Sequence, residues 1–297
     1  MNTISIAMAT YNGERYIREQ LDSILAQTIP FDELIICDDV SSDNTWDILQ
    51  EYATNDARIK IFKNEHNLGF IKNFEKVLAL CSGDYIALSD QDDIWLPEHL
   101  EILLNGIGRK LLAVGDAEIM TADGIKTGHI LSYCENADYT PENDLEKAYI
   151  IFFYHGCYQG ASMLMRKELL TKALPIPDGN VYHDVWLSAL SCFYGGLQRI
   201  DDVITLYRRH ETAVTGTRRR RTRIRTMVGH ILLKRGLRYR PAVVEAIQDR
   251  LSDTLTTEQL AFLEQADKYY KRRKTLWGRI RNLFFELKHY KLIYGCK

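Results

Sequence analysis

Short apolar runs alternate with segments of helical period through the first half of the chain, and this alternation constrains the fold more than any other feature. The runs, rich in β-branched residues, lie at 4–9, 33–37, 59–62 and 84–88. Between the first two, Ile17, Leu21 and Ile24 recur at helical spacing, so we expect a helix that returns the chain to a parallel neighbouring strand. The alternation predicts an α/β sheet with helices on its faces.

The second half is less regular. We expect a helix at 98–113, whereas acidic and turn-forming residues leave 115–150 without a predicted element. Strands are predicted at 160–165 and 199–207. Residues 217–297 are predicted to be mostly helical, because polar and apolar residues interleave there.

Charge divides the chain into two regions. Residues 1–216 contain 17 Lys and Arg against 33 Asp and Glu, whereas residues 217–297 contain 21 against 7. We therefore predict a main domain at 1–216 and a basic helical region at 217–297. The acidic main domain argues against a protein that wraps nucleic acid, and we expect no nucleic-acid partner.

Two sequence features bear on the compartment. No apolar stretch approaches the roughly 20 residues that span a bilayer, and no signal-peptide pattern opens the chain, so we expect a cytoplasmic protein. The six cysteines form no CxxC pair, which argues against a zinc ribbon or a disulfide framework.

The densest group of carboxylates follows the run at 84–88. Asp90, Asp92 and Asp93 supply three acidic side chains within four positions. Like charges this close repel one another, and a divalent cation among them, Mn²⁺ or Mg²⁺, relieves the repulsion and bridges the phosphates of a substrate. The alternative is an acidic turn whose carboxylates cap the following helix.

Polar turns also end the first two runs. Thr10-Tyr11-Asn12-Gly13 follows the first, and Asp38-Asp39 follows the second. In an open parallel sheet the ligand crevice lies beyond the carboxyl ends of the strands, so we predict that these turns share one site with the acidic motif. Tyr11 offers a flat face for a nucleobase. Each turn alone is also a common turn sequence.

Taken in order, these motifs resemble those of family 2 glycosyltransferases. The resembling segments are Ala9–Gly13, Ile35–Asp39 with Ser42–Thr45, Asn67–Gly69 and Gly83–Asp93. The resemblance covers about residues 3–216, and Ser-Asp-Gln-Asp-Asp-Ile-Trp is most similar to the bacterial rhamnosyltransferase-like branch. It implies a GT-A catalytic domain at 1–216, which is a Rossmann-like mixed sheet flanked by helices.

The resemblance also implies an activity. It is an inverting transfer of a sugar from a nucleotide-diphosphate donor, a UDP-sugar or dTDP-rhamnose, to a saccharide acceptor. The expected product is a cell-surface polysaccharide, such as capsule, O-antigen or cell-wall glycan.

Roles for single residues on the donor side follow from the same resemblance. Tyr11 would stack on the base, Asp39 would accept a hydrogen bond from it, and Asp92 with Asp93 would match the metal and ribose-phosphate motif. The implied donor-binding residues are Thr10, Tyr11, Asn12, Asp39, Asp90, Asp92 and His210. The implied metal ligands are Asp92 and Asp93.

Glycosyl transfer needs a base that deprotonates the acceptor hydroxyl. His183 and Asp184 offer an imidazole and a carboxylate, and the resemblance implies that Asp184 is the base. The alternative is that Asp184 caps a helix beginning at Val185. The resemblance further implies acceptor contacts from His183, Gln159 and Gly160, although Gly160 is also suited to opening a strand.

The basic region suggests a second partner. Six arginines lie within 218–225, and two further basic clusters, at 268–274 and 279–291, are mixed with aromatic residues. We predict that 217–297 contacts an anionic membrane, where each basic residue contributes about 1 kcal/mol. This would hold the enzyme on the inner face of the plasma membrane, near a lipid-linked acceptor. The alternatives are a solvated appendage and a homo-oligomer contact.

Two other functions are compatible with these residues. A metal-dependent nucleotidyltransferase would place the same carboxylates around a metal and release pyrophosphate. A non-catalytic module would use the sheet as a scaffold and the basic region to bind membrane or RNA.

Overall fold

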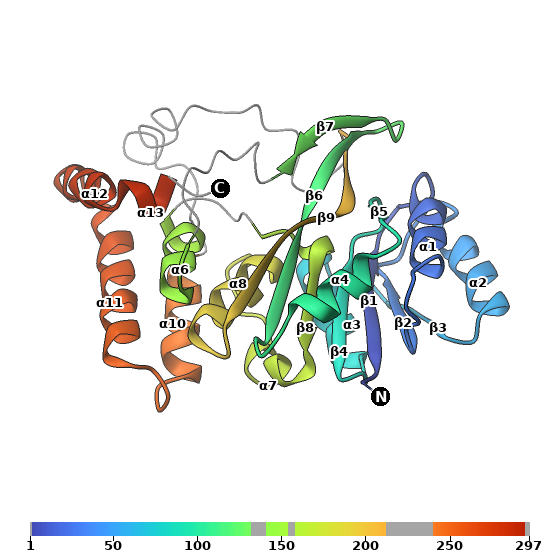
Figure 1. Ribbon diagram of the computed structural model, residues 1–297, viewed down its shortest axis with the longest axis horizontal. Helices are drawn as coiled ribbons and strands as arrows, with labels where there is room; N and C mark the ends of the chain where they lie inside the picture. Colours follow the sequence, from blue (N-terminus) through green and yellow to red (C-terminus); the bar gives the residue numbers. More distant parts are fainter. Residues whose placement is uncertain (1, 132–140, 154–157, 212–239, 295–297) are drawn as a thin grey trace. The chain divides into compact units, whose positions relative to one another are not determined.

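The computed structural model of the chain describes residues 2–131, 141–153, 158–211 and 240–294 (Figure 1). Contacts divide the chain into two compact units. The sheet unit consists of Met1–Leu131, Tyr158–Ile176 and Leu197–Thr217. The helical unit consists of Ser132–Cys157, Pro177–Gly196 and Arg218–Lys297. Two stretches that precede residue 216 in the sequence therefore belong to the helical unit.

Nine strands among the described residues form one mixed sheet, in the order β3-β2-β1-β4-β8-β6-β9-β5 with β7 paired to β6. The strands are β1 Ile4–Thr10, β2 Glu33–Asp38, β3 Ile59–Lys63, β4 Tyr85–Ser89, β5 Ile94–Trp95, β6 Leu112–Thr121, β7 Lys126–Ile130, β8 Met163–Arg166 and β9 Leu197–Arg209. The predicted parallel pairing of the first two strands is confirmed, with Ala7 opposite Ile35. β3 and β4 extend this parallel half on either side.

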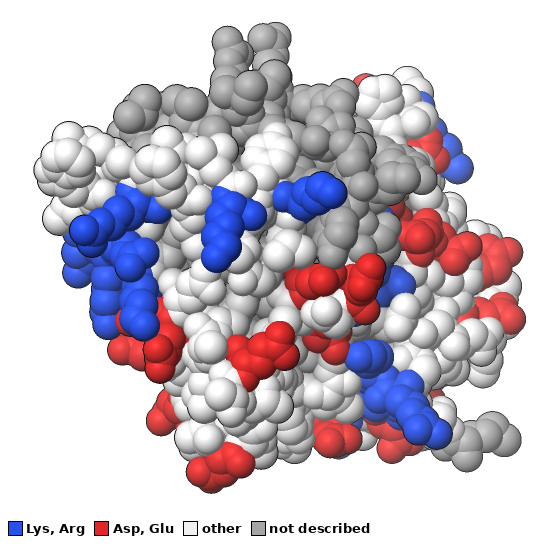
Figure 2. Space-filling model, turned by 60° about the vertical axis from the view of Figure 1, so that its left-hand side comes forward, with Lys and Arg blue, Asp and Glu red and all other residues white. Residues whose placement is uncertain are grey.

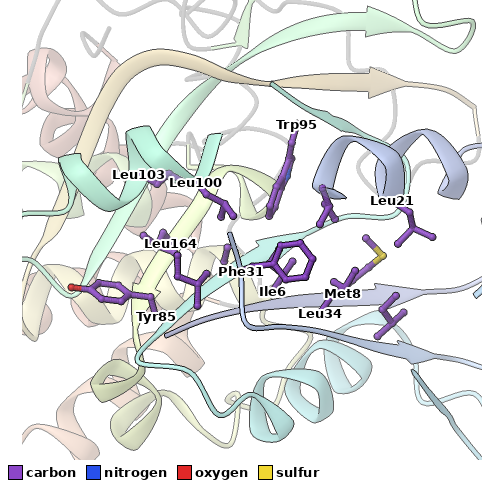
Figure 3. Packing of buried hydrophobic residues seen from close by; sticks show 14 of the residues in the cluster. Ile6, Met8, Leu21, Phe31, Leu34, Tyr85, Trp95, Leu100, Leu103 and Leu164 are labelled. Carbon is purple, nitrogen blue, oxygen red and sulfur yellow. The ribbon is translucent and has the colours of Figure 1, made fainter. Parts of the chain in front are cut away.

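Apolar side chains on one face of β1 and β2 fill the space under the helices. Ile6, Met8 and Leu34 lie in a buried cluster with Leu21 of helix α1 (Ile17–Leu25) and Leu100 of helix α4 (His99–Gly106) (Figure 3). Strand residues two apart share a face, which is why alternate β1 residues enter this cluster. Burial of each such side chain contributes roughly 1.5–3 kcal/mol relative to exposure.

The helices of the sheet unit are α1 Ile17–Leu25, α2 Thr45–Asn55, α3 Phe70–Leu80, α4 His99–Gly106 and α7 Leu170–Ala173. The predicted helix at 98–113 is too long, because Leu112 and Ala113 belong to β6. Both residues are fully buried and pair with β8 on one side and β9 on the other. β6, β7 and part of a helix occupy the stretch 115–150, for which the sequence predicted no element.

A buried carboxylate joins the strands at the end of the sheet away from the predicted site. Glu33 accepts hydrogen bonds from Ser5 Oγ at 2.6 Å, Lys60 Nζ at 2.7 Å and Ser82 N at 2.7 Å. Burial raises the pKa of Glu33, but the bonds from Lys60, Ser5 and Ser82 outweigh burial and lower it to about 2. The charged carboxylate therefore links β1, β2, β3 and the turn before β4.

The helical unit contains α6 Asp144–Phe153, α8 His183–Phe193, α10 Arg240–Arg250, α11 Thr257–Arg272, α12 Leu276–Lys288 and α13 Tyr290–Tyr294. Aromatic rings pack in its interior, with Phe153 4.9 Å from Phe285 and 5.8 Å from Phe262 between ring centroids. The helical extension predicted beyond residue 217 is present over 240–294. Within the described ranges, no helix has the length and apolar character needed to cross a bilayer.

Candidate functional site

The parallel half of the sheet contains a point where the chain order reverses. β2 and β3 extend the sheet on one side of β1, and the chain then returns through α3 to place β4 on the other side. Ligands of open α/β sheets bind beyond the strand ends at such a point. The turns that start at Tyr11, Asp39 and Asp90 leave these three strand ends. The structure therefore brings together the three turns that the sequence predicted to share an edge.

Gln91 joins the turn after β4 to the turn after β1. Its Oε1 accepts a hydrogen bond from Tyr11 N at 2.9 Å, and its Nε2 donates to Tyr11 O at 3.0 Å. A Cβ at Gly13 would lie 2.5 Å from Gln91 Oε1, so a larger residue there would displace this amide. Gln91, from the turn after β4, thus fixes the backbone of Tyr11 through both hydrogen bonds, while Tyr11 itself is 50% exposed.

The turn after β1 is also hydrogen-bonded to the turn after β2. Asn12 has a φ of +49°, and its Oδ1 accepts from Ser42 N at 2.8 Å while its own N–H donates to Ser41 Oγ at 2.9 Å. Asparagine tolerates this left-handed conformation better than most residues. Thr10 is buried and donates to Asp38 Oδ1 at 3.1 Å. Thr10 and Asn12 therefore shape the turn that carries Tyr11.

Asp39 is buried and holds the loop before α3. Its Oδ1 accepts from Asn64 Nδ2 at 2.8 Å and Leu68 N at 2.7 Å, and its Oδ2 accepts from Gly69 N at 2.9 Å. A carboxylate oxygen accepts about two hydrogen bonds. With one donor on Oδ2 among the described residues, Asp39 retains acceptor capacity for one further N–H.

The acidic motif contains carboxylates in two different environments. Asp92 Oδ2 lies 2.7 Å from His210 Nε2, and the Asp92 side chain is partly exposed. Asp93 is fully buried, and its Oδ1 accepts from Arg208 N at 2.9 Å. Burial raises the pKa of Asp93 well above its ordinary value, and the neighbouring carboxylates of Asp92 and Asp90 raise it further. Asp92 is consequently the accessible member of the pair.

Arg208 on β9 fixes the backbone of the acidic motif. Its buried guanidinium donates from Nε to Asp92 O at 2.8 Å, from Nη1 to Ala122 O at 3.0 Å and from Nη2 to Glu19 Oε2 at 2.7 Å. The guanidinium also lies over the Tyr16 ring, 4.6 Å from its centroid. The resemblance places Arg208 in the segment Tyr207–His210, in which a basic residue and His can reach the diphosphate, but the structure directs its guanidinium to Asp92 O, Ala122 O and Glu19. Gln91 lies inside the acidic motif and had no predicted role of its own.

Asp92 and His210 are the candidate ligands of a divalent cation at the exposed part of this motif. Ligand atoms around one Mg²⁺ or Mn²⁺ lie about 3 Å apart, which suits Asp92 Oδ2 and His210 Nε2. Such ions in substrate sites usually take one or two carboxylates and complete their shell with phosphate oxygens and water. The residues that the structure describes contain no group of three His, Cys, Asp or Glu side chains arranged for a metal. The arrangement suits a cation shared with a phosphate ligand.

The predicted acceptor residues Gln159 and Gly160 also belong to the sheet unit. Gly160 opens a short 3₁₀ turn, Gly160–Ser162, rather than a strand. Trp95, two residues after Asp93, donates from its indole N–H to Ala161 O at 3.2 Å. Both amide atoms of Gln159 are buried without a partner among the described residues. Buried amide groups normally have partners, so this side chain is suited to a polar ligand.

His183 and Asp184 belong to the helical unit. Helix α8 begins at His183, so Asp184 lies in its first turn, and Asp184 Oδ1 accepts from Val185 N at 2.6 Å. Negative charge is favourable at a helix N-terminus. Burial lowers the pKa of His183 to about 3, so its imidazole is neutral. The carboxylate of Asp184 therefore lies at this helix N-terminus, where it accepts the bond from Val185 N.

Comparison with known proteins identifies the family. The model of glycosyl transferase family 2 matches residues 5–170, more than half of the chain. The chain belongs to this family. Its GT-A fold, with a mixed sheet flanked by helices and a helical C-terminal extension, agrees with that of solved structures.

Two relatives of this family 2 chain illustrate the range of similarity. The putative teichuronic acid biosynthesis glycosyltransferase TuaG of Bacillus subtilis is 32% identical over 191 residues, 63% of this chain and 71% of TuaG. The Escherichia coli UDP-Glc:alpha-D-GlcNAc-diphosphoundecaprenol beta-1,3-glucosyltransferase WfgD is 40% identical over 102 residues, 34% of this chain and 40% of WfgD. Relatives from Haemophilus influenzae, Bacillus subtilis and Methanocaldococcus jannaschii are matched over only 30–36% of their lengths.

Two solved structures share the fold of this family 2 chain. S. aureus TarS 1–349 in complex with UDP-GlcNAc has a TM-score of 0.59 at 16% identity, over 97% of this chain and 91% of TarS. The mannosyltransferase PcManGT from Pyrobaculum calidifontis, in complex with GDP-Man and Mn²⁺, has a TM-score of 0.55 at 17% identity, over 98% and 87%.

Proposed function

We propose that this chain is an inverting, metal-dependent glycosyltransferase that uses a nucleotide-diphosphate sugar. The observation that carries the proposal is the pairing of Asp92 with His210 at the switch point where the turn bearing Tyr11 is held by Gln91. An exposed aromatic ring beside a cation site matches a ligand that has both a base and a diphosphate.

The donor is a UDP-sugar or dTDP-rhamnose. Tyr11 stacks on the base, and Asp39 accepts the N–H that uracil and thymine have in common. The UDP-GlcNAc bound to TarS and the UDP-Glc in the name of WfgD support a uridine donor. The sequence Ser89–Trp95 resembles that of the rhamnosyltransferase-like branch, and this resemblance supports dTDP-rhamnose as the alternative donor.

Asp92 and His210, with Asp90 beside them, would hold Mn²⁺ or Mg²⁺ together with the diphosphate. When bound, the ion stabilises the negative charge of the departing nucleoside diphosphate. The Mn²⁺ bound to the Pyrobaculum mannosyltransferase supports this choice of metal. Asp93 was predicted as a second metal ligand, but its burial suits it better to fixing Arg208 and the end of β9.

The acceptor side comprises Asp184, His183, Gln159 and Gly160. Asp184 takes the proton of the attacking hydroxyl, while the neutral His183 and the amide of Gln159 contact the acceptor. The names of TuaG and WfgD support an acceptor in cell-surface polysaccharide synthesis, attached in the case of WfgD to a lipid diphosphate. We further propose that 1–216 supplies the catalytic residues and that 217–297 contacts the cytoplasmic membrane face.

Nucleotide binding provides the first test. We expect UDP or dTDP with Mn²⁺ to raise the melting temperature by a few degrees, because a ligand at about 100 times its Kd stabilises by roughly 2.7 kcal/mol. GDP, CDP and ATP are the control nucleotides for comparison with UDP and dTDP. Each measurement is repeated with EDTA in place of Mn²⁺. Absence of a shift with all five nucleotides would contradict the donor site, and release of pyrophosphate during turnover would instead indicate a nucleotidyltransferase.

Replacing Gln91 with Ala is expected to weaken nucleotide binding about tenfold. The substitution removes two hydrogen bonds that fix the backbone of Tyr11, each contributing about 1 kcal/mol. Titration of UDP or dTDP measures the change, and kcat at saturating donor is expected to fall much less than KM rises. Gln50→Ala, on the exposed side of α2, is the matched control. Unchanged nucleotide affinity in Gln91→Ala would show that the two hydrogen bonds between Gln91 and Tyr11 do not contribute to binding of the nucleobase.

A further inference from the structure

Helix α12 turns its polar side inward. Gly278, Asn282 and Glu286 follow helical spacing and are the buried residues of this helix. Asn282 Nδ2 donates to Tyr269 O on α11 at 2.7 Å, and Tyr269 OH donates to Glu286. A Cβ at Gly278 would lie 2.0 Å from Arg272 O, so the end of α11 closely abuts α12. These contacts fix the rotation of α12 about its own axis.

The opposite side of α12 is apolar and exposed. Leu276 is 59% exposed, Trp277 77%, Phe284 67% and Leu287 50%. Leu276, Phe284 and Leu287 recur at helical spacing, so they lie on one face with Trp277 at its edge. A helix on the surface of a globular domain normally buries its apolar face and exposes its polar one. The reversal in α12 marks this face as an interaction surface.

Basic residues surround this face. Residues 268–291 contain nine Lys and Arg and one acidic residue, Glu286, which is buried. Exposed Arg281 and Lys288 lie on α12 itself, and Lys271 and Lys274 lie at and after the end of α11. Figure 2 brings the α11 and α12 side forward and shows Lys and Arg gathered there.

The basic surroundings decide which partner fits the apolar face. In a symmetric dimer the same patch meets itself, so the basic residues of one copy would face those of the other. Anionic lipid headgroups instead complement the charge, while the acyl boundary accepts Trp, Phe and Leu side chains. We infer that α12 lies in the plane of an anionic membrane surface, with its row of Leu276, Phe284 and Leu287 buried among the lipids.

This inference rests on the proposed membrane contact of 217–297 and assigns it to one helix. The competing element in the sequence is the arginine cluster at 218–225, which has charge without a comparable apolar row. Binding through α12 requires both apolar insertion and charge, whereas binding through the arginine cluster depends on charge alone. Apolar substitutions in α12 therefore separate the two.

Vesicle binding by the full chain tests the inference. We expect sedimentation with vesicles of equal parts phosphatidylcholine and phosphatidylglycerol, and little with phosphatidylcholine alone. Phe284→Ser and Arg281→Glu are each expected to weaken binding about tenfold or more. The matched controls, Ile125→Ser and Lys126→Glu, alter exposed residues near the β6–β7 turn and are expected to bind as the parent chain does.

Fluorescence gives a readout specific to this helix. Trp277 is the most exposed of the four tryptophans, so a blue shift on vesicle binding that disappears in Trp277→Phe would support its insertion. Vesicle binding that Phe284→Ser and Arg281→Glu leave unchanged would overturn the role of α12. A dimer in sedimentation equilibrium that Phe284→Ser dissociates, without vesicle binding, would overturn the membrane as partner. The Mn²⁺-dependent nucleotide shift, measured on the same variants, reports separately on the proposed function.

Discussion

Replacing Asp184 with Asn is expected to reduce sugar transfer by about 10²- to 10⁴-fold, the usual contribution of a general base. The amide cannot take the proton of the acceptor hydroxyl. Its side-chain oxygen can still accept the hydrogen bond from Val185 N, so the start of α8 is expected to persist. Transfer is measured as the rate of nucleoside diphosphate release in the presence of acceptor.

Donor binding separates catalysis from folding in this variant. The Mn²⁺-dependent thermal shift with nucleotide is expected to match that of the parent chain, because the donor contacts come from the sheet unit. Asp178→Asn, an exposed carboxylate a few residues earlier, provides the matched control and is expected to retain full transfer. Transfer by Asp184→Asn within a few fold of the parent rate would show that another group removes the proton.

Replacing Asp92 with Asn is expected to abolish the Mn²⁺-dependent part of nucleotide binding and to lower transfer about 10³-fold. The reason is that the substitution removes the accessible charge beside His210, and metal stabilisation of a leaving diphosphate is worth several kcal/mol. Isothermal titration of UDP or dTDP, with Mn²⁺ and with EDTA, measures the loss of metal dependence.

The fold of the Asp92→Asn variant is expected to survive. The amide oxygen introduced by the substitution can still accept a hydrogen bond from His210, and the main-chain oxygen that Arg208 contacts is unchanged. Glu98→Gln, an exposed carboxylate just before α4, is the control and is expected to keep its metal dependence. An Asp92→Asn protein whose nucleotide affinity still depends on Mn²⁺ would remove Asp92 from the metal site.

The local sequence pattern was sufficient to predict the parallel half of the sheet, β1 to β4. Apolar runs of strand length alternating with helical spacing predicted β1 to β4 and the parallel pairing of β1 with β2, because a helix between two strands brings the chain back in the same direction. The pattern also predicted that Tyr11, Asp39 and Asp92 share an edge, since parallel strands place their carboxyl ends together.

The half of the sheet beyond β4, in which parallel and antiparallel pairs are mixed, was less visible in the sequence. β6 pairs in parallel with β9, and these strands are separated by about 80 residues, so no local period indicates the pairing. The apolar residues Leu112 and Ala113 fit a helix as well as a strand until burial between β8 and β9 decides between them. The predicted helix at 98–113 was wrong at its end for this reason.

Distance along the chain also explains which site residues the sequence determined and which only the tertiary structure decided. The sequence alone determined the family motifs, the acidic cluster and the division of charge, because each is carried by neighbouring residues. Only the folded chain brings Arg208 and His210 to Asp92, joins Gln91 to Tyr11 and exposes the apolar side of α12. Contacts between distant segments depend on strand register and helix rotation, and burial of the whole core sets both.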